Sequence, residues 1–162
     1  MQLNGRIAII TGADSGIGQA AAEAQARAGA HIAVSYHTDA AGAEETRRRV
    51  EATGRKAFVS QSDIGDPASV TRLFEGCGAA LGTPDILIAN AGVAMSGMPV
   101  AEVDDSKFEE VIRTDLMGRS TAPAPSSRHG ATERAVASSS SARSPAISRH
   151  PRVRLTAWPR RA

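Results

Sequence analysis

The feature that most constrains the fold is a glycine-rich turn, TGADSGIG at residues 11–18, between an apolar segment and an alanine-rich segment. Residues 6–11, RIAIIT, are predicted to form a strand covered on both faces, because apolar side chains follow one another without polar interruption. After the turn, apolar residues recur at helical spacing: Ile17, Ala20, Ala21, Ala24 and Ala28. A strand, a glycine turn and a helix in this order begin a βαβ unit.

The same order of strand and helix is repeated along the first 118 residues. Further apolar strands are predicted at 31–36, 56–61 and 85–90, and helices at 40–53, from Asp66-Pro67 onward and at 101–117. Alternating strands and helices with short connections form an open parallel sheet with helices on both faces. The predicted fold class is therefore α/β.

The glycines of the turn are suited to binding a phosphate group. Gly12 permits a tight turn out of the strand, while Gly16 and Gly18 let the backbone approach a pyrophosphate and let helix and strand pack closely. The following helix presents free N–H groups and a partial positive charge to an anion. Glycines also mark ordinary strand–helix turns, but the elements on either side favour a dinucleotide site.

Two further motifs lie in register with this turn: Asp63-Ile64 after the third strand and Asn90-Ala91-Gly92 after the fourth. Together the three motifs resemble the short-chain dehydrogenases/reductases, especially the branch with bacterial glucose 1-dehydrogenase and 3-oxoacyl carrier-protein reductase. The resemblance runs from about residue 3 to Gly118. It implies a Rossmann-type doubly wound parallel sheet with strand order 3-2-1-4, which is incomplete because no fifth strand can be recognised after Gly118.

The resemblance also implies a nicotinamide cofactor across the ends of the strands. The glycine-rich turn would meet the pyrophosphate, the second motif the adenine, and the third the ribose while steadying the central sheet. The implied cofactor-binding residues are Thr11, Gly12, Ser15, Gly16, Ile17, Gly18, Tyr36, Asp63, Ile64, Asn90, Ala91 and Gly92. For Asp63 and Asn90 the alternative role is capping of a turn after a strand.

The end of the second strand bears on the choice of cofactor. An acidic residue there would hold the adenosine ribose hydroxyls of NAD, whereas a basic residue would favour the phosphate of NADP. Here the strand ends in Ser35 and Tyr36, which are neutral, followed by His37. Asp39 comes late and suits the N-cap of the next helix. These residues favour NADP, or the use of both cofactors.

The catalytic residues that the resemblance implies are missing. The family uses a serine to orient the substrate carbonyl and a tyrosine to transfer the proton, with a lysine four residues later that lowers the pKa of the tyrosine. Here the only tyrosine is Tyr36, and the only lysines are Lys56 and Lys107. Asp115 stands where the family has an asparagine; it could bind a water or simply be an exposed acid at a helix end. No catalytic residue and no metal ligand is assigned.

The composition changes at Gly118. Residues 1–118 carry 10 Lys and Arg against 16 Asp and Glu, whereas residues 119–162 carry nine Arg, no Lys and one acid, Glu133. The second segment also contains nine Ser and five of the eight Pro, without helical or strand periodicity. We therefore expect residues 1–118 to be the N-terminal part of a dinucleotide-binding domain and residues 119–162 to be a disordered, non-native tail.

Two explanations of the tail remain open. It could be a real basic extension that binds a partner, although it lacks the aromatic side chains and the basic helical face typical of nucleic-acid binding. It could instead be the product of a reading-frame shift after Gly118. If Ser138–Ser141 are encoded by TCN codons, the frame offset by two bases reads four apolar residues, as a fifth strand would require. Synonymous codons for residues 134–162 can be chosen that yield a strand, a serine and Tyr-x-x-x-Lys in that frame.

The function predicted from the resemblance is that of an NAD(P)-dependent oxidoreductase acting on a small alcohol or carbonyl compound, with this chain inactive. The alternative is a non-catalytic dinucleotide-binding or interaction protein with a basic tail. We expect no nucleic-acid partner, for the reasons given for the tail. We expect no membrane partner either, since no signal or membrane-spanning segment is evident. Cys77 is the only cysteine, which suits a cytoplasmic location. Family members form oligomers, and the resemblance implies that the helix at 101–117 helps to bury a subunit interface. We expect the truncated fold to impair this assembly.

Overall fold

The computed structural model describes residues 2–93 and 104–117. The strands are β1 (Ile7–Thr11), β2 (His31–Tyr36), β3 (Ala57–Gln61) and β4 (Ile86–Ile88). The helices are α1 (Gly16–Arg27), α2 (Ala40–Glu51), α3 (Pro67–Ala80) and α4 (Asp105–Val111), the last followed by a π-helical stretch, η2 (Ile112–Met117). Residues 119–162, which contain the predicted tail, lie outside the described residues.

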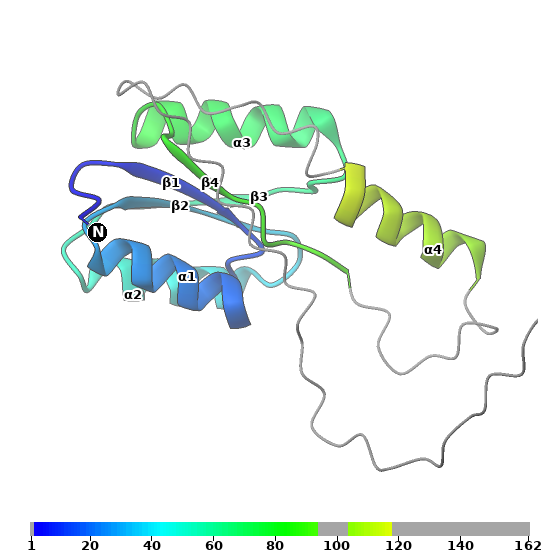
Figure 1. The fold of residues 1–162 in the computed structure, drawn as a ribbon, viewed down its shortest axis with the longest axis horizontal. Helices are drawn as coiled ribbons and strands as arrows, with labels where there is room; N and C mark the ends of the chain where they lie inside the picture. Colours follow the sequence, from blue (N-terminus) through cyan, green and yellow to red (C-terminus); the bar gives the residue numbers. More distant parts are fainter. Residues whose placement is uncertain (1, 94–103, 118–162) are drawn as a thin grey trace, which may run out of the picture.

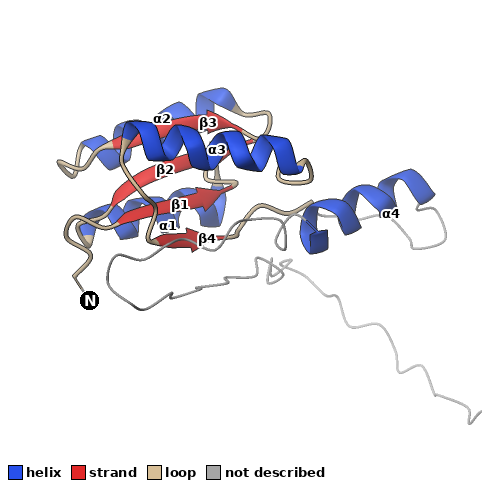
Figure 2. Ribbon diagram, turned by 90° about the horizontal axis from the view of Figure 1, so that it is seen from above, coloured by secondary structure: helices blue, strands red, loops and turns tan. Residues whose placement is uncertain are grey.

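The four strands form one parallel sheet in the order β3-β2-β1-β4, which confirms the predicted Rossmann-type topology. Figure 1 shows α1 and α2 on one face of the sheet and α3 on the other. Seen from above in Figure 2, α4 lies beyond the end of the strands. Both faces of the sheet are therefore covered by helices, as a parallel sheet requires.

The alternation of side chains along β1 supplies both halves of the core. Ala8 and Ile10 pack toward α1 and α2, whereas Ile7 and Ile9 pack toward α3. Leu73 of α3 is 1% exposed and belongs to the second cluster. Because each face needs apolar residues, the strand appears in the sequence as one uninterrupted apolar run.

The helix starts agree with the capping signals in the sequence. Asp39 accepts a hydrogen bond from the N–H of Gly42 at 2.9 Å, and Asp66 caps α3 through the N–H groups of Ala68 and Ser69 at 3.1 Å. Of the helix predicted at 101–117, residues 101–103 lie outside the described residues; from Asp105 on the chain is helical, and Asp104 accepts from the N–H of Lys107 at 2.8 Å.

The helical spacing on α1 indicated its inward side only in part. Ala21 and Ala28 pack against the core, but Ile17, Ala20 and Ala24 are exposed. The fully inward residues are Gly18, Ala22 and Ala26, a glycine and two alanines that let α1 pack closely against the sheet. On the surface of α2, Glu44 pairs with Arg47 and Glu45 pairs with Arg49.

β4 is short, and side chains extend its pairing with β1. The buried carboxylate of Asp85 accepts from the N–H of Ile7 at 3.0 Å, while its own N–H donates to the carbonyl of Ile7 at 2.8 Å. Arg6 lies 3.8 Å from the same carboxylate. Within the described residues β4 is an edge strand, and its three apolar residues are buried.

Cys77 is a packing residue. It is fully buried on the inner face of α3, against the sheet, and burial raises the pKa of its thiol to about 11. The thiolate is therefore scarce at neutral pH, which argues against a nucleophilic role. None of the described helices is both long enough and apolar enough to cross a membrane.

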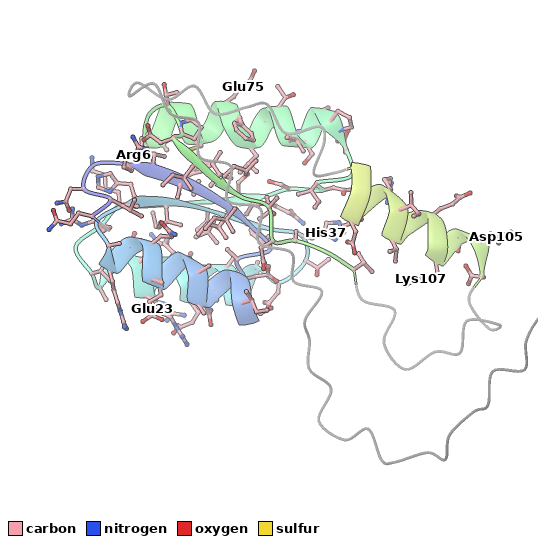
Figure 3. The ribbon with its side chains drawn as sticks, viewed as in Figure 1. Arg6, Glu23, His37, Glu75, Asp105 and Lys107 are labelled. Carbon is pink, nitrogen blue, oxygen red and sulfur yellow. The ribbon has the colours of Figure 1, made fainter. Side chains whose placement is uncertain are left out.

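We predict that Leu73→Ala lowers the free energy of unfolding by about 2–5 kcal/mol, because it leaves a cavity between α3 and the sheet. Glu75→Ala on the same helix should change it by less than about 0.5 kcal/mol, since Glu75 points into solvent (Figure 3). Urea unfolding followed by circular dichroism measures both values. Equal effects of the two substitutions would show that the α3 cluster does not stabilise the domain.

Candidate functional site

A cleft of about 410 Å³ lies where the carboxyl ends of the strands meet. Ten of the twelve residues predicted to bind a cofactor line it: Gly12, Ser15, Gly16, Ile17, Tyr36, Asp63, Ile64, Asn90, Ala91 and Gly92. Thr11 and Gly18 do not line it but contact residues that do: the hydroxyl of Thr11 accepts from the N–H of Asn90, and Gly18 packs against the carbonyl of Gly12. The cleft therefore gathers the three sequence motifs, which are far apart along the chain.

The glycine-rich turn needs its glycines for two different reasons. Gly12 and Gly16 have φ angles of 62° and 51°, a region that other residues rarely adopt. Gly18 has no room for a side chain, because a Cβ there would lie 2.0 Å from the carbonyl oxygen of Gly12. The turn and the first turn of α1 are thus in direct backbone contact, as a close approach to a phosphate requires.

The N-terminus of α1 is open toward the cleft. Ser15 occupies the N-cap position, but its side chain makes no capping hydrogen bond, and the first turn contains no acidic residue. Both α2 and α3, in contrast, are capped by an aspartate. The first N–H groups of α1 are consequently available to an anion in the cleft, where the helix dipole favours negative charge.

Hydrogen bonds between Thr11 and Asn90 join the ends of β1 and β4. The hydroxyl of Thr11 accepts from the N–H groups of Asn90 and Ala91 at 3.1 and 3.0 Å. The side-chain amide of Asn90 donates to the carbonyl oxygens of Thr11 and Gly12, both at 3.0 Å. Because these groups are buried or partly buried, the network fixes the position of the glycine-rich turn relative to the fourth strand.

The end of β2 contributes no acidic side chain to the cleft. Ser35, Tyr36, His37 and Thr38 line it, and His37 lies at the end of the sheet near α4 (Figure 3). The hydroxyl oxygen of Ser35 is buried and has no hydrogen-bond partner among the described residues. Asp39 is engaged as the cap of α2 and does not line the cleft.

The second motif shapes the floor of the cleft beyond β3. The carboxylate of Asp63 accepts from the N–H of Gly65 at 2.8 Å, which is the turn-capping role considered for this residue. The N–H of Asp63 donates to the hydroxyl of Ser69 at 3.0 Å. Ile64 is 8% exposed and offers an apolar surface to the cleft. Asp63 thus caps a turn and lines the cleft at the same time.

Sequence reasoning did not assign several other lining residues: Asp14, Ser62, Val93, Arg113 and Thr114. The last two reach the cleft because η2 carries Asp115, whose carboxylate accepts from the N–H of Val93 at 2.9 Å. This bond ties the loop after β4 to η2. Asp115 is therefore neither a free helix-end acid nor directed away from the site; its position at the family's asparagine was the only signal in the sequence.

The described residues provide binding groups but not the family's catalytic set. Tyr36 is in the cleft, and Lys56 and Lys107 do not line it. The described residues also contain no cluster of histidine, cysteine and acidic side chains able to hold a metal ion. What the cleft offers is an open helix N-terminus, a glycine-rich backbone and an apolar wall.

We predict that Gly18→Ala lowers the free energy of unfolding by about 1–3 kcal/mol, because the added methyl group forces the turn away from α1. Gly78→Ala is the matched control: a Cβ at Gly78 meets nothing within 4 Å, so its higher helix propensity should raise stability by about 0.5–1 kcal/mol. Thermal unfolding of both variants measures the difference. A Gly18→Ala protein as stable as the control would contradict the close packing.

The short chain dehydrogenase family matches residues 6–124. A versicolorin reductase of Emericella nidulans is 35% identical over 118 residues, covering 73% of this chain and 44% of the relative. Cis-4-hydroxycyclohexanecarboxylate dehydrogenase of Sinomonas cyclohexanicum is 36% identical, with 70% and 45% covered. General stress protein 39 of Bacillus subtilis is 39% identical, with 71% and 40% covered. The chain thus spans less than half the length of these relatives.

Solved structures show the same likeness. A short-chain dehydrogenase from Burkholderia cenocepacia in complex with NADP superposes with a TM-score of 0.71 at 30% identity, covering 75% of this chain and 49% of that one. A short-chain dehydrogenase/reductase from Mycobacterium marinum gives 0.69 at 29% identity, with 74% and 48% covered. With the fold, the glycine-rich turn and the sequence in agreement, the chain belongs to the short-chain dehydrogenase/reductase family.

Proposed function

We propose that the cleft binds NADP or NAD and is the cofactor-binding half of a short-chain dehydrogenase. The observation that carries the proposal is the N-terminus of α1, which lacks a side-chain cap and follows a turn whose glycines have no side chains to block a ligand. Such a site holds a pyrophosphate through backbone N–H groups. The bound nicotinamide would supply the hydride donor or acceptor. The lone buried thiol of Cys77 agrees with a reducing, cytoplasmic setting.

Within this proposal, NADP is accepted at least as well as NAD. An NAD-selective site places a carboxylate against the adenosine ribose. Here the carboxylate of Asp39 accepts a hydrogen bond from the N–H of Gly42 instead. Ser35 lines the cleft at the end of β2, and its buried hydroxyl has no partner among the described residues. A phosphate on that ribose would meet hydroxyl groups and the imidazole of His37, and no acidic side chain from β2.

We predict that the full 162-residue chain binds NADP with an affinity equal to or higher than its affinity for NAD in isothermal titration calorimetry. The affinity for both should fall as salt is added, because the ligand phosphates interact with a helix dipole and are screened. A folded protein that binds neither cofactor would refute the proposal, and one that binds NAD far more tightly would refute the NADP preference.

We further propose that this chain by itself does not catalyse dehydrogenation. The Tyr-x-x-x-Lys pair that the family uses is absent from all 162 residues, and Tyr36 has no lysine four residues later. The purified chain should therefore show no NAD(P)H turnover with alcohols or carbonyl compounds, the sugars and 3-oxoacyl thioesters of the glucose 1-dehydrogenase-like branch included. Turnover at a rate typical of the family, followed at 340 nm, would show that other residues do this work.

We also propose that residues 119–162 arise from a shift of reading frame after Gly118. The support is the abrupt change to serine, proline and arginine in residues 119–162, where neither strand periodicity nor a Tyr-x-x-x-Lys sequence is found. The DNA around the codon of Gly118 decides the matter. Restoring one frame should yield a longer protein with a serine, a fifth strand and Tyr-x-x-x-Lys, and an open reading frame without them would refute the shift.

A non-catalytic dinucleotide-binding or interaction protein with a basic tail is the alternative function. It is favoured only by the arginine content of residues 119–162. The coding DNA distinguishes the two proposals. If the tail is genuine, the reading frames beside its own encode no continuation of the family's sequence.

A further inference from the structure

The glycine-rich turn is supported from outside the cleft by α2. Ala13, in the middle of the turn, is fully buried, and its N–H donates to the carbonyl of Ser35 at the end of β2 at 3.0 Å. Its carbonyl oxygen accepts from the hydroxyl of Thr46, on α2, at 2.7 Å. Both polar groups of this one peptide position are therefore held by elements other than α1.

We propose that Thr46, with Gln19, is a positioning residue that holds the glycine-rich turn in the shape that receives the pyrophosphate. This inference rests on the proposed dinucleotide function and extends it to residues that do not line the cleft. Neither residue belongs to the three motifs of the sequence, and Thr46 lies 33 positions from its partner Ala13.

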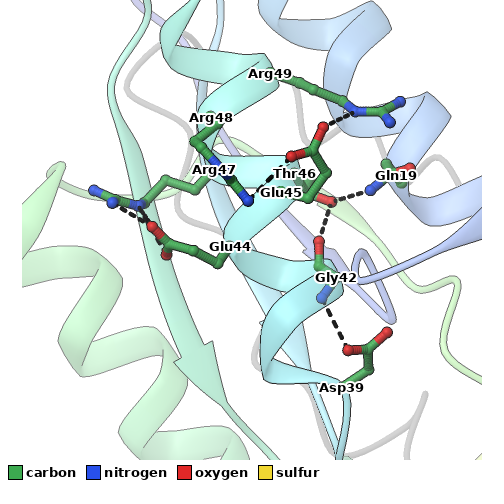
Figure 4. Close-up of polar contacts among 9 residues, drawn as sticks. All are labelled: Gln19, Asp39, Gly42, Glu44, Glu45, Thr46, Arg47, Arg48 and Arg49. Atoms are coloured by element: carbon green, nitrogen blue, oxygen red, sulfur yellow. Dashed lines mark hydrogen bonds and ion pairs between the residues drawn. The ribbon is translucent and has the colours of Figure 1, made fainter.

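The hydroxyl of Thr46 is oriented from two sides. Besides Ala13, it lies 3.0 Å from the carbonyl oxygen of Gly42, one turn earlier in α2, and its single hydrogen is shared between the two carbonyls. It also accepts from the side-chain amide of Gln19, on α1, at 2.8 Å. Figure 4 shows the contacts of Thr46 with Gln19 and Gly42. Because Gln19 occupies one lone pair, the hydrogen of the hydroxyl is directed toward the carbonyls.

Gly42 brings α2 into contact with the same turn. A Cβ at Gly42 would lie 2.3 Å from the carbonyl oxygen of Asp14 and 2.5 Å from the carboxylate of Asp39. The first turn of α2 therefore packs by its backbone against the outer side of the glycine-rich turn. The cap formed by Asp39 fixes where this first turn begins.

The consequence for binding is preorganisation. A turn rich in glycine loses much conformational freedom when it becomes ordered, and this loss opposes binding if it occurs together with it. Bonds to Ala13 from β2 and α2 order the turn before the ligand arrives. The gain in affinity is limited to ligands that carry the group bound by the turn, which is the pyrophosphate. Binding of the adenine moiety should not depend on it.

The first test needs no ligand. Hydrogen exchange of the full chain, followed by mass spectrometry, should become faster at residues 12–18 in Thr46→Val than in the wild type, while residues 57–61 stay unchanged. Thr46→Ser keeps the hydroxyl and should restore wild-type exchange. Thr71→Val is the matched control, because Thr71 makes the same bond to a carbonyl one turn earlier, Pro67 at 3.0 Å, on an exposed part of α3.

The second test separates pyrophosphate from adenine. In Thr46→Val the affinity for ADP should fall about three- to tenfold, the effect of one lost buried hydrogen bond, while the affinity for adenosine stays unchanged. Thr46→Ser and Thr71→Val should bind both as the wild type does. Isothermal titration calorimetry measures ADP, and chemical-shift titration measures the weaker adenosine complex.

The outcomes distinguish the two levels of the proposal. If the wild type binds no dinucleotide, the proposed function fails, and exchange at residues 12–18 alone decides whether Thr46 orders the turn. Unchanged exchange and unchanged ADP affinity in Thr46→Val overturn the positioning role. If Thr46→Val does not fold, Gln19→Leu, at a half-buried position, takes its place: a smaller loss in the same direction supports the role, and wild-type behaviour overturns it.

Discussion

The close contact between the glycine-rich turn and α1 is the constraint on which the rest of the structure depends. With only hydrogen at Gly18, the helix approaches the carbonyl of Gly12 closely enough that a methyl group would overlap it. This approach sets the direction of α1, and with it the open N-terminus that faces the cleft. The small residues Ala22 and Ala26 continue the same contact along the sheet.

Around this contact, each neighbouring strand supplies bonds to the turn. Asn90, after β4, binds the carbonyl oxygens of Thr11 and Gly12 from one side, while Ser35, at the end of β2, accepts from Ala13 on the other. The two strands flank β1 in the sheet, so the turn between β1 and α1 is held across the switch point of the topology. A site at this point is the usual place for a ligand in an open parallel sheet.

Much of this architecture could be predicted from the sequence, because apolar runs and turn residues act locally. The four strands, the cap at Asp39 and the start of α3 at Asp66-Pro67 were all predicted within a residue or two of their observed positions. The inward face of α1 was predicted only in part, since Ile17 is 52% exposed although its spacing suits a buried face. Its exposure follows from its place in the first turn of α1, where it lines the cleft and does not face the core.

The sequence by itself determined the order of the elements and the glycine-rich turn, because each depends on neighbours within a few residues. The parallel sheet then follows from the alternation of strands and helices. Only the tertiary structure decided which side chains support that turn. Thr46 reaches Ala13 across 33 positions, and Asp115 reaches Val93 across 22. Such bonds depend on where helices pack against the sheet, and side-chain packing over long sequence separations leaves no periodic signal in the chain.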